Sequence, residues 1–149
     1  MALKFDALKV GKLLAAFKQA QKRLQDLARL PKEEFLTDPD KIGSAKYHFI
    51  VAIEAAIDLS NHIIARNNLR IPEDYADTFR ILGEAGIFPP EFVTTLIKMT
   101  RFRNRLVHIY WDVDSDTLYN ILVNGLKDLD AYLKAMGKFF TGNKEEPYC

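Results

Sequence analysis

The sequence predicts an all-α fold, a single bundle of about five helices, on the strength of three observations. Apolar residues recur at steps of three and four positions along most of the chain. Prolines and capping aspartates separate these runs, and no stretch of useful length alternates apolar and polar residues as a strand would. The length of 149 residues, with 48% hydrophobic and 28% charged residues, is typical of one globular domain and excludes disordered and low-complexity classes.

The first two helices have the clearest patterns. The first carries the apolar stripe Leu13, Phe17, Ala20, Leu24 and Leu27 and should end around Leu30, before Pro31. The second begins with Asp38 as N-cap and Pro39 in the first turn, and carries the stripe Ala45, Phe49, Ala52, Ala56, Leu59 and Ile63. Its other side holds four more isoleucines, Ile50, Ile53, Ile57 and Ile64. This helix therefore lies at the centre of the bundle or is partly covered by a second subunit.

Three more helices are predicted from caps and periodicity. A short third helix opens at residues 71–74 and ends near Gly83 or Gly86, and a fourth begins at the pair of prolines at 89 and 90 and runs through Leu106. After a turn, Asp114 caps a fifth helix, whose apolar stripe runs from Leu118 to Met136. We expect one domain over residues 1–140, followed by a flexible tail over residues 141–149.

The charge and cysteine content narrow the class of protein. The formal net charge of +1 disfavours a globally basic nucleic-acid binder but leaves room for a local basic site. One cysteine, Cys149, allows neither a disulfide framework nor a cysteine-based zinc site and indicates a reducing compartment. The N-terminal residues are too charged for a secretory signal, and the longest apolar stretch, residues 49–59, is too short to span a membrane. We expect a cytoplasmic protein without a membrane segment.

Residues 98–112, KMTRFRNRLVHIYWD, form the most unusual stretch of the sequence. Its four basic residues, Lys98, Arg101, Arg103 and Arg105, meet no acid until Asp112. Such a run is often only a solvated helix face. Here Asn104, His108 and Tyr110 follow closely, and an arginine, an imidazole and a phenol are groups that can hold and act on a phosphodiester.

Helical geometry brings some of these side chains together. At about 100° per residue, Arg101, Asn104, Arg105 and His108 form one polar stripe, and Arg103 and Tyr110 share another face. Arg103 and His108, however, lie about 140° apart on a regular helix. They can converge if long side chains curl into one groove, if the helix end is distorted, or if a second subunit completes the site. We favour the second subunit, because it also explains the apolar surface of the second helix.

These residues resemble the HEPN superfamily. Residues 103–110 fit its R-x4-H-x-Y signature and look most like the HepT toxin branch; residues 52–63 and 111–114 resemble the corresponding helix and turn of that branch. The resemblance spans residues 38–133. It implies a homodimeric helical bundle whose motif helices line one cleft, a metal-independent ribonuclease site that needs no cofactor. By position, Arg103 and His108 are its essential residues, with Asn104 in a supporting role.

The resemblance also implies a partner. Toxins of this branch are usually paired with a small MntA-type nucleotidyltransferase antitoxin, which attaches adenylyl groups to the motif tyrosine, here Tyr110. The other interpretation of Tyr110 is that it packs with Trp111 at the helix end. A second class of function also stays open, in which the bundle is a non-catalytic subunit that presents nucleotide or substrate to a nucleotidyltransferase.

Other candidate residues have simpler explanations. His48 and His62 lack a second ligand at a metal-binding spacing, so we expect no metal, and His62 packs or hydrogen-bonds within the bundle unless it and Asp58 support the cleft. The aspartates at 112, 114 and 116 imitate the start of an EF-hand, but helix capping explains them better because the later ligand positions are wrong. Tyr119 and Tyr132 fall on or beside core stripes and are expected to pack.

Overall fold

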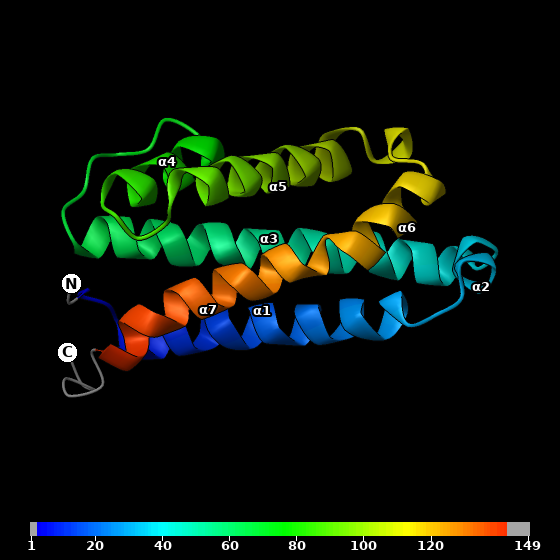
Figure 1. The fold of residues 1–149 in the computed structure, drawn as a ribbon, viewed down its shortest axis with the longest axis horizontal. Helices are drawn as coiled ribbons and strands as arrows, with labels where there is room; N and C mark the ends of the chain where they lie inside the picture. Colours follow the sequence, from blue (N-terminus) through cyan, green and yellow to red (C-terminus); the bar gives the residue numbers. More distant parts are fainter. Residues whose placement is uncertain (1–2, 143–149) are drawn as a thin grey trace.

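The structure is a computed structural model that describes residues 3–142, with side chains up to residue 140. Over this range the chain forms seven α-helices, one 3₁₀ turn and no strand (Figure 1). The elements are α1 (Ala7–Ala28), α2 (Lys32–Leu36), α3 (Pro39–Arg66), α4 (Tyr75–Glu84), α5 (Pro90–His108), the 3₁₀ turn η1 (Tyr110–Asp112), α6 (Ser115–Asn124) and α7 (Leu126–Gly142). The all-α prediction is confirmed. Residues 143–149, which include Cys149 and most of the predicted tail, lie outside the described residues.

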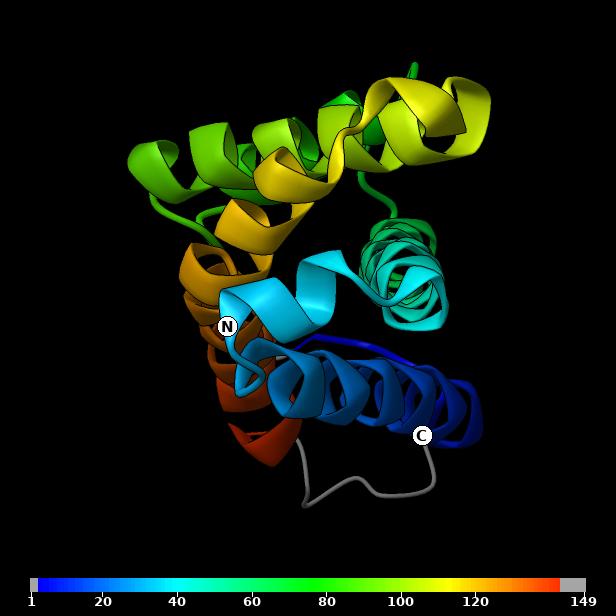
Figure 2. The same ribbon diagram turned by 90° about the vertical axis from the view of Figure 1, so that its right-hand side faces the viewer.

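Helix α3 is the centre of the bundle. Helix α1 lies along one side of it, while α4 and α5 form a second layer on the opposite side (Figures 1 and 2). Helices α6 and α7 return from the end of α5 and pack against α1. The core between these layers includes fully buried aromatic side chains from four helices, namely Phe17, Phe35, Phe79 and Tyr132.

The central position of α3 explains its apolar circumference. Ile53, Ile57 and Ile64 are all buried by helices of the same chain, and Ile50 is half-buried. By length and composition alone α3 could also cross a membrane. A helix covered on most sides within a bundle has the same composition, because each buried face must be apolar. Of the two explanations offered by the sequence, the central position is therefore sufficient, and the isoleucines no longer argue for a second subunit.

The predicted caps are largely confirmed. The side chain of Asp38 accepts hydrogen bonds from the backbone of residues 40 and 41 at the start of α3. Asp74 and Asp114 cap α4 and α6 in the same way. Gly86, just past the end of α4, has φ of 80°, which favours glycine. Helix α5 begins at Pro90, in agreement with the expected start.

The described residues form seven α-helices rather than about five. Helix α1 begins at Ala7, capped by Asp6, and so extends six residues before Leu13, the first residue of the predicted stripe. The five-residue α2 was not predicted, because a single turn has no periodicity to read. The expected fifth helix is broken at Gly125 into α6 and α7, where a Cβ atom would lie 2.7 Å from the carbonyl oxygen of Ile121. The apolar stripe continues across this break, so the pattern did not reveal it.

Candidate active site

Arg103 lies on the face of α5 that packs toward α3 and α4. Its side chain is 12% exposed, and one terminal nitrogen is 3.4 Å from a carboxylate oxygen of Glu54 on α3. The guanidinium carbon lies 5.1 Å from the centre of the Tyr75 ring at the start of α4. The other terminal nitrogen donates to Oδ1 of Asn104 at 3.0 Å. The Nε atom is buried and has no hydrogen-bond partner among the described residues. The site thus holds a largely enclosed cation with unused donor capacity.

Two acids one helical turn apart on α3 lie near this guanidinium. Glu54 forms the ion pair, and Asp58 follows four residues later. Loss of solvent around Asp58, and then repulsion from Glu54, raise the pKa of its carboxyl above the usual value, while the positive charges of Lys9 and Arg103 oppose this shift. Arg103 therefore faces a concentrated negative charge that fixes its position on the α3 side.

His108 is the last residue of α5 and is exposed. Within the described chain its ring has no hydrogen bond or ion pair, and nothing joins it to Arg103. Asn104 is also exposed and contacts the arginine rather than the imidazole, so its observed role is to orient Arg103. The polar stripe predicted over Arg101, Asn104, Arg105 and His108 is confirmed, since all four side chains are exposed.

Tyr110 lies beyond the end of α5. Helix α5 stops at His108, and Ile109 turns the chain out of helical geometry with φ of −135° and ψ of 56°. The expectation that Arg103 and Tyr110 share a helix face is therefore wrong, because Tyr110 belongs to η1. Its ring is covered by the ammonium of Lys46, 4.0 Å from the ring centre. No ring contact joins it to Trp111 in the described part of the chain, so packing with that residue does not explain its position.

Lys46 holds the 3₁₀ turn onto α3. Its side chain is buried, it donates to the backbone oxygen of Tyr110 at 3.1 Å, and burial lowers the pKa of its ammonium. The phenol oxygen of Tyr110 approaches α3 at Gly43, where it lies 3.9 Å from the position a Cβ atom would take. At the other edge of the turn, Arg105 contacts the Asp112 carboxylate at 3.3 Å. The cation beside the motif tyrosine is thus Lys46 rather than Arg103.

Within one chain, the motif residues therefore form two centres. Arg103, Asn104 and Glu54 form one, and Tyr110 with Lys46 forms the other. Glu54 and Lys46 are eight residues apart on α3, roughly 12 Å along the helix axis. Neither a curl of the Arg103 side chain nor the distorted helix end joins Arg103 to His108 here.

Sequence reasoning did not assign three of these side chains to the site, namely Glu54, Lys46 and Tyr75. Glu54 lies within the apolar stretch of residues 49–59, and an acid at such a position was the available signal for a buried cation opposite it. Asp58 was named only with His62, as a support for the cleft. Lys46, next to buried Ala45, gave a similar signal. Nothing in the sequence singles out Tyr75, because its contact with Arg103 depends on how α4 packs on α5.

The remaining candidates have structural roles. The Nε2 atom of His62 accepts a hydrogen bond from the backbone of Asp6 at 3.0 Å, and burial, followed by Lys9 and Arg66, lowers its pKa. His48 donates through Nδ1 to the Ser44 carbonyl at 2.7 Å. No group of three possible metal ligands occurs among the described residues.

The tyrosines and aspartates that were expected to be structural also have partners in the bundle. Tyr132 is fully buried and bonds to Ser60 and Ala56, and Tyr119 bonds to the Leu30 carbonyl, as expected of packing residues. The aspartate at 116 pairs with Lys32.

A family model described as "Ribonuclease HepT-like" matches residues 17–136. The chain belongs to this family. The predicted resemblance is thereby confirmed, and so is membership of a class of ribonucleases. The match covers α3, α5 and η1, and therefore both centres of the motif.

Two curated relatives agree with this assignment. The chain is 30% identical to the mRNA nuclease HepT of Shewanella oneidensis over 80 residues, which are 54% of this chain and 60% of that protein. This match therefore spans less than two thirds of the relative. The chain is also 27% identical to the tRNA nuclease HepT of Aphanizomenon flos-aquae over 128 residues, which are 80% of this chain and 86% of that one.

A solved structure shares the fold. It is the tri-AMPylated Shewanella oneidensis HEPN toxin in complex with MNT antitoxin, with a TM-score of 0.80 and 25% identity. The alignment covers 87% of this chain and 97% of the toxin. The helical arrangement described above is therefore that of a HEPN toxin.

Proposed function

We propose that this chain is a metal-independent ribonuclease toxin, a soluble cytoplasmic protein silenced by an MntA-like nucleotidyltransferase antitoxin. The observation that carries the proposal is the enclosed Arg103 guanidinium, whose Nε has no partner, in a member of a ribonuclease family. A guanidinium can bind a phosphate through its terminal nitrogens and stabilise the charge that develops on it. The nuclease names of both relatives and the antitoxin complex of the structural neighbour support the assignment.

RNA supplies its own nucleophile, so the protein needs a base, an acid and a cation. The 2′-oxygen bonds to phosphorus while the bond from phosphorus to the 5′-oxygen breaks. The base takes the 2′-hydroxyl proton, and the acid gives a proton to the departing 5′-oxygen. Arg103 binds the crowded phosphorane. His108 is the candidate for proton transfer, and two copies of His108 in a symmetric dimer supply one base and one acid.

The second copy is also supported by the surface next to His108. Three large apolar side chains next to it in the chain are exposed, Val107, Ile109 and Trp111, with Trp111 80% exposed. Exposed apolar residues gathered at one end of a helix favour an interface. A two-fold contact at this end would bring the His108 of one subunit toward the motif helix of the other.

Adenylylation of Tyr110 is the proposed means of silencing. Tyr110 is 44% exposed as a residue, so part of it faces the solvent from which a transferase would approach. The new phosphodiester would carry a negative charge next to Lys46, which is 4.0 Å from the ring, and the nucleotide would occupy the surface near His108. In this arrangement blockage is steric, since Arg103 lies about two helical turns away along α3.

The decisive experiment is cleavage of RNA by the purified protein with and without EDTA. We expect cleavage to survive the chelator and to fall about 10²–10⁴-fold in His108→Ala and Arg103→Ala with unchanged helical circular dichroism. Cleavage that stops with EDTA, or that persists in His108→Ala, contradicts the mechanism. Binding to the transferase without any nuclease activity would instead favour the non-catalytic partner.

Tyr110→Phe should escape silencing when the transferase is co-expressed, as read by mass spectrometry.

A further inference from the structure

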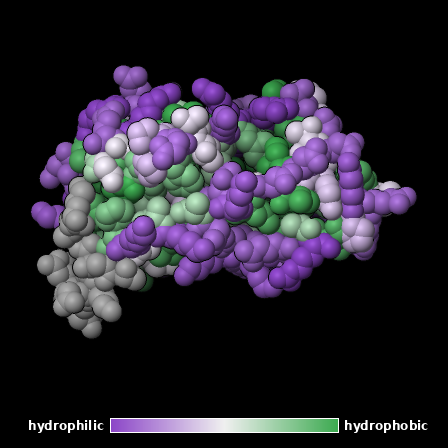
Figure 3. All heavy atoms as spheres, in the orientation of Figure 1, coloured by the Kyte–Doolittle hydropathy of each residue, from purple (hydrophilic) through white to green (hydrophobic). Residues whose placement is uncertain are grey.

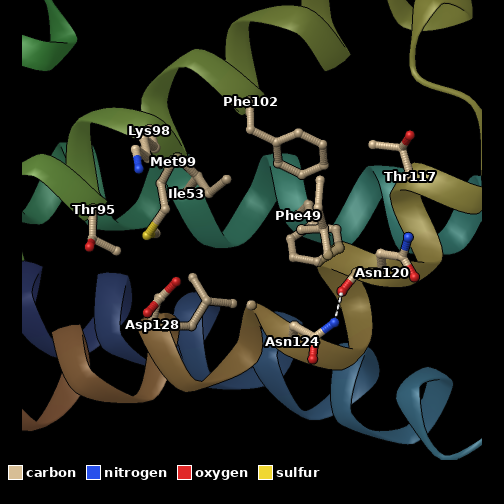
Figure 4. Close-up of a pocket in the computed structure, with 13 residues that line it drawn as sticks. Phe49, Ile53, Thr95, Lys98, Met99, Phe102, Thr117, Asn120, Asn124 and Asp128 are labelled. Atoms are coloured by element: carbon tan, nitrogen blue, oxygen red, sulfur yellow. Dashed lines mark hydrogen bonds between the residues drawn. The ribbon is translucent and has the colours of Figure 1, made fainter.

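A pocket of about 520 Å³ opens between α3, α5, α6 and α7. Helix α3 forms its floor with Phe49 and Ile53, and α5 forms one wall. The opposite wall comes from α6 and α7 (Figure 4). In the space-filling view of this side, hydrophobic atoms reach the surface between rows of hydrophilic side chains (Figure 3). The volume lies within the range of small-molecule sites.

The α6–α7 wall carries polar groups without side-chain partners. Asn120 and Asn124 lie one turn apart on α6, and Asp128 follows on α7 beyond the break at Gly125. The amide nitrogen of Asn124 donates to the Asn120 carbonyl at 3.0 Å. Among the described residues, the Asn120 amide and the Asp128 carboxylate have no hydrogen bond or ion pair. The pocket therefore combines an apolar floor with free donors and acceptors along one edge.

The α5 wall adds an aromatic ring and positive charge. Phe102 is half-buried, lines the pocket and contacts the Phe49 ring edge-on at 5.3 Å between centroids. Lys98 lies at the rim, and Arg101 follows one turn later on the exposed side. Neither has an acidic partner in the described part of the chain. From the pocket, this basic stripe leads along α5 to His108.

We propose that the pocket receives one unstacked base of single-stranded RNA, whose adjoining phosphates lie on Lys98 and Arg101. The proposal rests on the proposed ribonuclease function and adds a substrate subsite to it. A base presents a flat apolar face to Phe102 and hydrogen-bonding edges to amide and carboxylate groups. The phosphates complement the unpaired cations. An apolar helix of a protein partner would instead cover Asp128 and the two asparagines without satisfying them.

The test uses two neighbouring threonines of α5 as a matched pair. Thr95 lines the pocket and Thr94 is exposed outside it, and each hydroxyl donates to the carbonyl four residues earlier at 3.4 Å. Thr95→Trp fills the pocket, whereas Thr94→Trp places the same side chain in solvent. Both are made in a His108→Ala background, so that RNA is not cut. Binding of a single-stranded oligoribonucleotide and of its abasic counterpart is measured by fluorescence anisotropy.

We expect Thr95→Trp to weaken binding of the intact RNA on the order of tenfold, the scale of one stacked base. The abasic RNA should bind the Thr95→Trp and Thr94→Trp proteins equally. Asn120→Ala is a second, milder variant, and it should also lower the affinity for the intact RNA. Lys98→Gln should lower the affinity for both the intact and the abasic RNA. Lys127→Gln, on the exposed side of α7, is its control and should change neither affinity.

The outcomes separate the two proposals. The subsite is contradicted if intact RNA binds equally well to three variants, Thr95→Trp, Asn120→Ala and Thr94→Trp. That result would not contradict the ribonuclease function. Loss of transferase binding in Thr95→Trp, with RNA binding unchanged, identifies the pocket as a protein interface and also overturns the subsite. A parent protein that neither binds nor cleaves RNA contradicts the proposed function itself.

Discussion

Arg70 and Arg103 both face acidic side chains, yet their surroundings differ in an instructive way. Arg70 is 45% exposed, and four of its hydrogen bonds, at 2.7 to 3.0 Å, go to the carboxylates of Asp77 and Glu84. Arg103 is only 12% exposed, contacts Glu54 at 3.4 Å, and leaves its Nε without a partner among the described residues.

Burial alone would predict the reverse, because an enclosed cation needs its partners most. The difference indicates two tasks. Arg70 ties the loop before α4 to that helix, and every contact serves the fold. Arg103 pairs with a single acid within the chain, which fits the phosphate-binding role proposed for it.

The largest change in activity is expected when each arginine is replaced by lysine. Arg103→Lys loses the planar fork of donors, so RNA cleavage should fall about 10²–10³-fold while the melting temperature barely moves. Arg70→Lys should lower the melting temperature by a few degrees and leave cleavage unchanged. Cleavage rates and thermal unfolding of both variants give the answer. Equal loss of activity in the two would remove the distinction.

The hydrogen bonds between Arg70 and Asp77 should also make the stability of the protein depend on pH. Hydrogen bonds from Arg70, and then from the Glu73 backbone, lower the pKa of Asp77 from 3.8 to about 2. A lowered pKa in the folded state means that this stabilisation is complete above about pH 4 and is lost as the pH falls toward 2. Asp77→Asn should therefore be less stable than the parent near neutral pH, and the gap should close in acid. Chemical unfolding at several pH values measures it, and a gap independent of pH contradicts the assignment.

Glu54 should have an intermediate effect through Arg103. Glu54→Gln removes the charge that fixes the guanidinium on the α3 side, and we expect kcat to fall about tenfold from poorer positioning. KM should not rise, because one negative charge near the RNA is also removed. Asp130→Asn on α7 is a matched control, since it removes an acid that pairs with Lys134 far from the site. A Glu54→Gln enzyme with normal kcat would show that the pair has no positioning role.

The smallest effect is expected at Tyr75. Its ring supports the Arg103 guanidinium at 5.1 Å and is itself 42% exposed. Tyr75→Leu should lower cleavage two- to fivefold, which corresponds to about 0.5–1 kcal/mol for an exposed cation–π contact. Tyr75→Phe keeps the ring and should match the parent. If the phenylalanine variant is as slow as the leucine one, the hydroxyl rather than the ring face is what matters.

The sequence was most informative where one residue decides a local structure. Asp38 with Pro39, and Asp114, marked helix starts because a cap acts on the next two or three residues. The break at Gly125 was not predicted, because the apolar stripe of α6 continues into α7. Apolar periodicity does not reveal a change in the direction of the helix axis.

The same division holds for the candidate site. The sequence by itself determined the all-α class, the capped helix starts and the motif from Arg103 to Tyr110, because these depend on neighbours along the chain. Only the tertiary structure decided that Glu54 and Tyr75 hold Arg103, that Lys46 rather than Arg103 lies against Tyr110, and that α3 is covered within one chain. Those contacts join residues far apart in sequence, and they depend on where α5 ends and how it packs on α3 and α4.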